Sequence, residues 1–319
     1  GVSITLTRVP NWWADQKKFF KNRFNPDKIR VTVIREPAKA FELFRKGELD
    51  WHSLRIPKDW YEKLPDNALE VTKGYIHKVQ FYNEIPRPTW ALRINCSKPL
   101  LKDRDVRVGL HHAMNWALVI KEVFHGDYAR MQSVADGYGR CSNPSVKARE
   151  FSVEKAEQAF AKAGFTERGA DGILKNSKSQ RLSFSITTGY KRYTAALTVL
   201  QQEAKKAGVE IKLEILELTA GWKKTDEKEH EIGFGGLNIS VELYPRFWET
   251  NHSDNAYKED GDTKYAEDGS LKGNLTLKKN TNNETATADQ EIDKLIKQYR
   301  EAEDMDEIIR LSHELIERL

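Results

Sequence analysis

One segment of this chain, residues 181–216, constrains the fold more than any other because it joins a strand, a helix and a second strand. RLSFSITT at 181–188 and VEIKLEIL at 209–216 have the pattern of half-buried strands. Between them, the spacing predicts a helix from about Tyr193 to a glycine stop at Gly208. Its apolar stripe is formed by Leu197, Leu200, Ala204 and Ala207. Such a connection joins parallel strands with a right-handed crossover, so the sequence predicts a mixed α/β fold.

The length, composition and charge of the chain limit the classes of protein to which it can belong. With 319 residues, of which 39% are hydrophobic and 31% charged, it is long enough for two cores. No apolar run approaches the roughly 20 residues that a membrane span needs. The 52 basic and 48 acidic residues leave a small net charge of +4, spread along the whole chain. We therefore expect no nucleic-acid partner.

Before residue 95 the pattern indicates a first unit. Residues 4–10 and 29–37 read as half-buried strands, AKAFELFRKG at 38–47 as a helix, and LDWHSL at 49–54 as another strand. EIPRPTW at 84–90 holds two prolines, which fit neither a helix nor a central strand. We therefore predict a hinge at 84–95, with residues 1–92 in one domain and 93–319 in another.

After the hinge, helices dominate the pattern. Asp103 is a good N-cap for an amphipathic helix of about five turns that ends at Gly126, and a shorter helix is expected from Ser152 to Gly164. Residues 251–288 form a long polar tract with too few apolar side chains for a core, predicted to be a surface excursion. Two helices close the chain, and both chain ends read as interruptions of a longer protein. The spacing of Cys96 and Cys141 does not decide whether they are bridged.

The segment KPLLKDRDVRVGLHHAMNWALVIKEVFHG, residues 98–126, resembles the signature of family 5 extracellular solute-binding proteins, the oligopeptide- and dipeptide-binding subunits of ABC importers. FELFRKGELD at 41–50 and FSVEKAEQAFAKAGF at 151–165 resemble two further family segments, and the long tract after residue 250 resembles the YejA-like branch. The resemblance implies a two-lobed periplasmic-binding-protein-like fold (type II, class C), here lacking its N-terminal part. Residues 1–92 would be part of the first lobe and residues 93–319 the second lobe, with the excursion at 251–288.

What the resemblance implies for function is the capture of short peptides or peptide-like compounds in a cleft between the lobes. The partners would be such a ligand and the membrane permease subunits of an ABC transporter, and the protein would act as a monomer. Its location would be periplasmic, or extracytoplasmic with a lipid anchor. A signal peptide is not part of this chain.

A peptide offers an ammonium group and a carboxylate, so its receptor needs an acid and a base. In residues 234–249 the resemblance implies an acid that pairs with the amine, and Glu242 is the nearest, with Asn238 and Ser240 as neighbouring candidates. The family's Asp is not matched there, so a solvated loop Glu is an equal alternative. For the carboxylate, Arg192 or Lys191 follows a strand at its carboxyl end, and solvated cations are the alternative.

Aromatic residues supply the remaining candidates. Trp51 and His52 lie on the strand predicted to enter the cleft, and a core role for Trp51 is an equal alternative. Trp248, in an aromatic cluster with Tyr244 and Phe247, is a weaker candidate than a packing residue.

Enzymatic alternatives have little support in the sequence. It has no G-x-S-x-G, no phosphate-binding G-x-x-x-x-G-K-[ST] and no H-E-x-x-H, so we expect no enzyme, metal or cofactor. Two alternatives stay open. One is a binding protein for a nickel or haem chelate, a sugar or an opine, and the other is a hydrolase with catalytic residues upstream of this chain.

Overall fold

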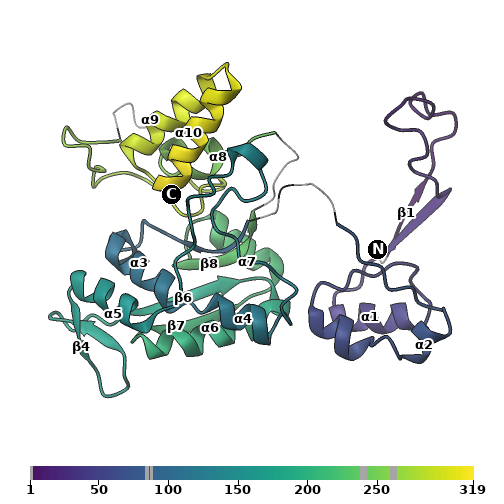
Figure 1. Cartoon of the computed structure of the whole chain (residues 1–319), viewed down its shortest axis with the longest axis horizontal. Coiled ribbons are helices and arrows are strands. Elements are labelled where there is room, and N and C mark those ends of the chain that lie inside the picture. Colours follow the sequence, from purple (N-terminus) through teal and green to yellow (C-terminus); the bar gives the residue numbers. More distant parts are fainter. Residues whose placement is uncertain (1–2, 83–85, 87–88, 238–242, 259–263) are drawn as a thin grey trace. The chain divides into compact units, whose positions relative to one another are not determined.

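The computed structural model describes residues 3–82, 86, 89–237, 243–258 and 264–319 (Figure 1). Its contacts divide the chain into two compact units, Gly1–Gln80 and Phe81–Leu319. The division falls about a dozen residues before the predicted boundary at 92 and 93, because the strand at Thr89–Ile94 pairs within the second unit. That the two units correspond to two lobes stays a prediction.

The first unit begins with a two-stranded antiparallel ribbon of β1 (Ser3–Thr7) and β2 (Lys28–Thr32). Ile4 lies opposite Val31, and Leu6 lies opposite Ile29. Every residue of both strands is exposed, so the prediction of half-buried strands is wrong. Among the described residues each strand has only the other as a partner, and neither face of the ribbon is covered.

The rest of the first unit is a small helical body. It contains α1 (Pro37–Arg45), one turn of π-helix (Asp59–Lys63) and α2 (Leu69–Thr72). Phe41, Leu64 and Ile76 form its core. The strand predicted at 49–54 is irregular instead, because no strand of the described chain lies beside it to take its backbone hydrogen bonds.

A four-stranded sheet organises the second unit, in the order β3 (Thr89–Ile94), β8 (Ile232–Leu237), β6 (Ser183–Thr188), β7 (Glu210–Ile215). β6 is parallel to both β7 and β8, whereas β3 runs antiparallel to β8. The connection from β6 through α6 (Thr194–Lys206) to β7 is the one predicted from the sequence. The predicted α/β class is confirmed.

Helices lie against both faces of this sheet (Figure 1). On one face, Trp116 of α4 (Trp116–Glu122) stacks on Phe234 of β8, with ring centroids 6.3 Å apart. On the other face, Lys224 of α7 (Leu218–Asp226) donates a hydrogen bond to the carboxylate of Glu214 on β7. The same carboxylate also accepts a hydrogen bond from Thr187 of β6. The helix predicted from Asp103 to Gly126 is two helices, α3 (Arg104–Ala113) and α4.

The break between α3 and α4 has a local cause. Asn115 lies just before α4, and its side chain accepts a hydrogen bond from the backbone N–H of Leu118, which starts a new helix. Asp103 caps α3 as predicted, and Ser152 caps α5 (Val153–Lys162). A short hairpin follows α5, formed by β4 (Phe165–Arg168) and β5 (Leu174–Asn176).

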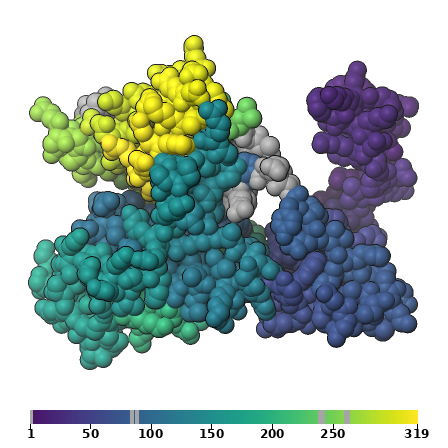
Figure 2. Space-filling view, viewed as in Figure 1, coloured from purple at the N-terminus to yellow at the C-terminus, as the bar shows by residue number. Residues whose placement is uncertain are grey.

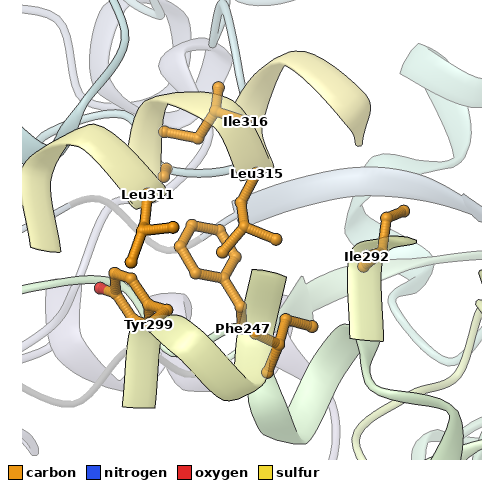
Figure 3. Packing of buried hydrophobic residues seen from close by; sticks show 8 residues of the cluster. Phe247, Ile292, Tyr299, Leu311, Leu315 and Ile316 are labelled. Atoms are coloured by element: carbon orange, nitrogen blue, oxygen red, sulfur yellow. The ribbon is translucent and has the colours of Figure 1, made fainter. Parts of the chain in front are cut away.

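The last two helices form a second core in this unit. Both α9 (Gln290–Glu301) and α10 (Met305–Arg318) are observed where they were predicted. They enclose Phe247, which precedes α8 (Trp248–Asn251), together with Leu311 and Leu315 (Figure 3). The segment that contains Cys141 and Asn143 lies against α10, where Ser312 donates a hydrogen bond to the Cys141 carbonyl. In the space-filling view, teal atoms from the middle of the chain adjoin the yellow atoms of the C-terminal helices (Figure 2).

The polar tract at 251–288 is better packed than predicted. Ala256, Tyr257 and Ala286 are buried together, and Leu271, Leu275 and Leu277 pack against them. The expectation that the tract lacks a core is therefore wrong: these apolar side chains, widely spaced in the sequence, converge when the segment folds on itself. Cys96 and Cys141 are both free thiols. No helix in the described part of the chain is long and apolar enough to cross a membrane.

Candidate functional site

The carboxyl end of β6 carries an arginine held by aromatic rings. After Thr188 the chain turns, with the Thr188 hydroxyl oxygen accepting a hydrogen bond from the backbone N–H of Tyr190. The guanidinium of Arg192 lies over three rings, 5.7 Å from the centroid of Trp90, 5.1 Å from Tyr190 and 4.9 Å from Tyr193. Arg192 is exposed, and no carboxylate of the described residues pairs with it. Its charge is therefore positioned yet available to a ligand.

The three rings that support Arg192 belong, together with Phe234, to one aromatic cluster, defined here as Trp90, Tyr190, Tyr193 and Phe234. Trp90 contacts Tyr190 and Tyr193 with centroids 4.9 and 5.0 Å apart, and Tyr193 contacts Phe234 edge-on at 5.5 Å. The cluster draws on β3, on β8 and on the loop after β6. Since each ring is locked by its neighbours, the cluster is a firm platform at the edge of the sheet.

Glycines of β8 make room for the side chains of β3. A Cβ atom at Gly236 would lie 2.8 Å from the ring of Trp90, and one at Gly235 would lie 2.7 Å from an Nη atom of Arg93. Neither position has space for a side chain. Trp90 and Arg93 therefore lie across β8, on opposite faces of the sheet, because they are an odd number of residues apart on one strand.

Arg93 forms a buried ion pair with Glu284. Nη1 of Arg93 is 2.8 Å from Oε1 of Glu284, and the two side chains are 6% and 4% exposed. Burial lowers the pKa of Arg93 and raises the pKa of Glu284, and in each case the partner's charge opposes the effect. The pair is only partly satisfied, because Nε of Arg93 and Oε2 of Glu284 have no hydrogen-bond partner.

Further buried polar groups surround this pair. Lys228 donates hydrogen bonds to the carbonyl of Lys278 and, at 2.9 Å, to the hydroxyl of Thr281, and burial lowers its pKa to about 8. His230 is fully buried with both ring nitrogens unpartnered, and burial lowers its pKa to about 3. A neutral imidazole is therefore expected at physiological pH.

A small pocket opens beside Arg93, and we call it the Arg93 pocket. Arg93 and Phe234 from the sheet line it, with further walls from the loop after β6 and from α7: Thr188, Gly189, Tyr190, Gly221, Trp222 and Thr225. The loop and the helix approach closely, since a Cβ atom at Gly221 would lie 2.6 Å from the backbone nitrogen of Gly189. The pocket thus lies next to the aromatic cluster, with Tyr190 and Phe234 common to both.

The predicted residues of the first unit have different environments. Trp51 is 74% exposed. His52 packs against Phe41 and Phe44 of α1, with ring centroids 5.5 Å apart in both cases, and burial lowers its pKa. The packing of His52 supports a structural role, whereas the exposure of Trp51 is compatible with ligand contact.

The predicted residues of the second unit do not all lie at one site. Lys191 and Arg192 are both exposed in the loop after β6. Trp248 instead stacks on His252 at 3.9 Å and lies under the guanidinium of Arg300 at 4.0 Å, so its contacts are those of a packing residue. Asn238, Ser240 and Glu242 lie outside the described residues.

Four residues of the site were missed in the sequence, namely Trp90, Arg93, Tyr190 and Trp222. Trp90 and Arg93 lie on a strand whose partner could not be identified from local periodicity. The one available signal was the Gly-Gly pair at 235 and 236, since glycine inside a strand marks a close approach of other groups.

Comparison with known proteins identifies the family of this chain. Residues 1–259 match the family model "Bacterial extracellular solute-binding proteins, family 5 Middle". YejA of Escherichia coli (strain K12) is 29% identical over 133 residues, which are 42% of this chain and 22% of YejA. The oligopeptide-binding protein AppA of Bacillus subtilis (strain 168) is 26% identical over 241 residues, 74% of this chain and 42% of AppA.

Solved structures share the fold. The structure of AppA in complex with a nonapeptide matches all of this chain and 56% of its own, with a TM-score of 0.72 and 20% identity. NikZ from Campylobacter jejuni, in complex with Ni(L-His), matches 99% of this chain and 56% of its own, with a TM-score of 0.69 and 16% identity. The chain thus spans about half the length, or less, of these relatives. The predicted fold is confirmed, and the chain belongs to the family 5 bacterial extracellular solute-binding proteins, a family of binding proteins rather than enzymes.

Proposed function

We propose that this chain is part of an extracytoplasmic receptor that captures short peptides or peptide-like compounds and delivers them to an ABC importer. The receptor acts in the periplasm, or outside the membrane on a lipid anchor, and as a monomer. The observation that carries the peptide proposal is Arg192, exposed and free of any described carboxylate while three aromatic rings hold its guanidinium.

Arg192 suits the carboxylate end of a peptide. A guanidinium presents two parallel N–H donors that match the two oxygens of a carboxylate, and the rings behind it keep its plane from turning freely. Its place at the carboxyl end of β6 is the edge at which open α/β sheets bind ligands. Lys191 adds a second cation to the same loop. The proposed amine partner is Glu242, and Asn238 and Ser240 of the same sequence segment are further candidates.

Capture and release follow from the family's two-lobed design. We propose that the two units close on the ligand, with the exposed ring of Trp51 covering part of it. The ligand stabilises the closed form, and the permease subunits bind this form in preference to the open one. No covalent step and no cofactor are required.

Ligand identity is tested first by native mass spectrometry of the purified protein, at the full length that its gene encodes, followed by denaturation to release what co-purifies. Recovered short peptides support the proposal. A nickel chelate or a sugar instead would keep the binding role and overturn the peptide ligand.

The role of Arg192 is tested by calorimetry with an alanine tripeptide that ends in either a free carboxylate or an amide. Arg192→Lys should weaken binding of the free acid by about tenfold, the scale of one charge-assisted hydrogen bond, and change binding of the amide far less. The matched control is Arg310→Lys, an exposed arginine of α10 paired with Glu314. Equal losses for both peptides would overturn the assignment of Arg192 to the carboxylate.

A further inference from the structure

The loop that joins β1 to β2, residues 8–27, is compact although it contains no regular helix or strand, and we call it the tip loop. It stands at the end of the ribbon (Figure 1). At its base, the backbone N–H of Arg8 donates a hydrogen bond to the carbonyl of Asp27 at 2.8 Å. Inside it, the N–H of Lys21 donates to the carbonyl of Lys17 at 2.9 Å. Compact surface loops whose two ends meet in this way are frequently functional.

The aromatic residues of the tip loop are of two kinds. Trp12 is half-buried and contacts Phe20 and Phe24 edge-on, with ring centroids 5.2 and 5.7 Å apart. By contrast, Trp13 is 76% exposed and Phe19 is 74% exposed, and Phe24 is 62% exposed despite its contact with Trp12. A loop that packs around one ring and still presents three others to solvent has the character of an interaction surface.

Cations accompany the exposed rings. The tip loop contains five cations and two acids, a net charge of +3: Arg8, Lys17, Lys18, Lys21 and Arg23 against Asp15 and Asp27. Asp15 is paired with Arg8 at 3.2 Å, and the other four cations form no ion pair within the described part of the chain. Nζ of Lys18 lies 5.6 Å from the centroid of Phe19. The surface therefore combines apolar rings with positive charge that the chain itself does not neutralise.

This combination fits a bilayer with anionic lipids better than a protein partner. At a membrane surface, aromatic rings enter the boundary between headgroups and acyl chains, while Lys and Arg are attracted to anionic headgroups. The cores of protein interfaces are depleted in lysine, whereas three lysines follow Trp13 and flank Phe19 in this loop. Proteins of this family are extracellular, so nucleic acid is not the polyanion that they meet.

We propose that the tip loop docks the protein on a bilayer that contains anionic lipids, with Trp13, Phe19 and Phe24 at the interface and the unpaired cations against the headgroups. The surface is separate from the proposed peptide site, because the tip loop belongs to the first unit and Arg192 to the second. Docking therefore requires no peptide. It keeps the receptor at the surface in which its transporter lies, which raises its effective concentration there.

The test measures co-sedimentation with vesicles. It uses the protein at the full length that its gene encodes but without any signal segment, so that no acyl chain is attached. Vesicles of equal parts phosphatidylcholine and phosphatidylglycerol should bind the protein at least about tenfold more tightly than vesicles of phosphatidylcholine alone, since each cation near an anionic surface contributes about fivefold. Added salt should weaken this binding, because it screens exposed charges.

One variant tests the rings. Trp13→Ala with Phe19→Ala removes two exposed side chains and should weaken binding to the anionic vesicles by about tenfold, because less apolar surface enters the bilayer. The matched control is Tyr75→Ala, which removes a ring of the same unit that is 78% exposed but lies outside the tip loop. It should leave binding unchanged, and an equal loss in this control would overturn the role of the two rings.

A second variant tests the cations. Lys18→Gln with Lys21→Gln should weaken binding by about 25-fold at low salt, at about fivefold for each charge. Lys46→Gln with Lys73→Gln has the same net charge but alters exposed lysines elsewhere in the first unit, and it should retain binding. Equal losses in the two variants would show attraction by the net charge of the whole protein and would overturn the assignment to the tip loop.

The unsubstituted protein alone can overturn the proposal, whatever the stability of the variants. Equal binding to the two kinds of vesicle, or binding to neither, would do so. Binding to the purified permease subunits in detergent that is lost in Trp13→Ala with Phe19→Ala, without binding to vesicles, would assign the tip loop to a protein partner instead. Because no peptide is present, each of these results leaves the proposed capture of peptides to its own test.

Discussion

Replacing Glu284 by leucine should destabilise the second unit strongly. The change leaves the guanidinium of Arg93, only 6% exposed, without the carboxylate oxygen that now lies 2.8 Å away. Removal of one partner from a buried ion pair costs about 3–5 kcal/mol, because the remaining charge stays out of water without compensation. For a unit of 150–250 residues, each kcal/mol lowers Tm by about 2–4 °C, so we expect a fall of about 6–20 °C.

The same reasoning predicts the behaviour of a double variant. Arg93→Met with Glu284→Leu removes both charges and fills the space with apolar atoms, so its stability should lie within about 2 kcal/mol of the unsubstituted protein. Urea unfolding followed by tryptophan fluorescence measures both variants. Glu314→Leu is the control, because its pair with Arg310 is exposed and should contribute less than about 1 kcal/mol. A loss below about 1 kcal/mol in Glu284→Leu, or a double variant no more stable than the single one, would refute the reasoning.

Two further predictions concern the same face of the sheet. Gly221→Ala should cost about 1–3 kcal/mol in thermal unfolding, because its Cβ would meet the backbone of Gly189 at 2.6 Å, whereas Gly273→Ala, with no atom within 4 Å, should change stability by less than about 0.5 kcal/mol. His230→Leu should reduce the acid sensitivity of the fold. Burial lowers the pKa of His230 to about 3, so the unfolded chain binds more protons than the native one below pH 6.5 and stability falls as the pH falls. Between pH 7 and 5 this imidazole accounts for about 2 kcal/mol of that loss, and an unchanged pH profile in the variant would contradict the assignment.

Local patterns predicted the parts of the fold whose structure is locally determined. The β6–α6–β7 unit was predictable because alternating and helical periodicities follow one another within a single stretch of chain. The single helix from Asp103 was wrong because the apolar stripe continues across Asn115, where a side-chain hydrogen bond starts a second helix. In the ribbon of β1 and β2, alternation predicted strands correctly but said nothing about whether a second layer covers them.

The site was predictable only where one loop forms it. Arg192 was found because its loop follows a recognisable strand. Its aromatic supports were not all found, because the contact between Trp90 and Phe234 depends on the pairing of β3 with β8, strands far apart in the sequence. Glu284 reaches Arg93 from a tract that composition alone classed as surface. Long-range pairing of this kind leaves no periodic signal in either segment.

At this edge of the sheet, the glycines of β8 provide backbone that side chains of the neighbouring strand cover. Because Gly235 and Gly236 contribute no side chains, Trp90 and Arg93 of the neighbouring strand lie over β8, and Phe234 is the side chain that β8 itself adds to the aromatic cluster. At these two positions β8 therefore supplies backbone, and β3 supplies the side chains that cover it. A designer who wishes to change the side chains at this edge can therefore begin at position 90 of β3, whereas a change at position 93 has to be combined with a change of Glu284, its buried partner.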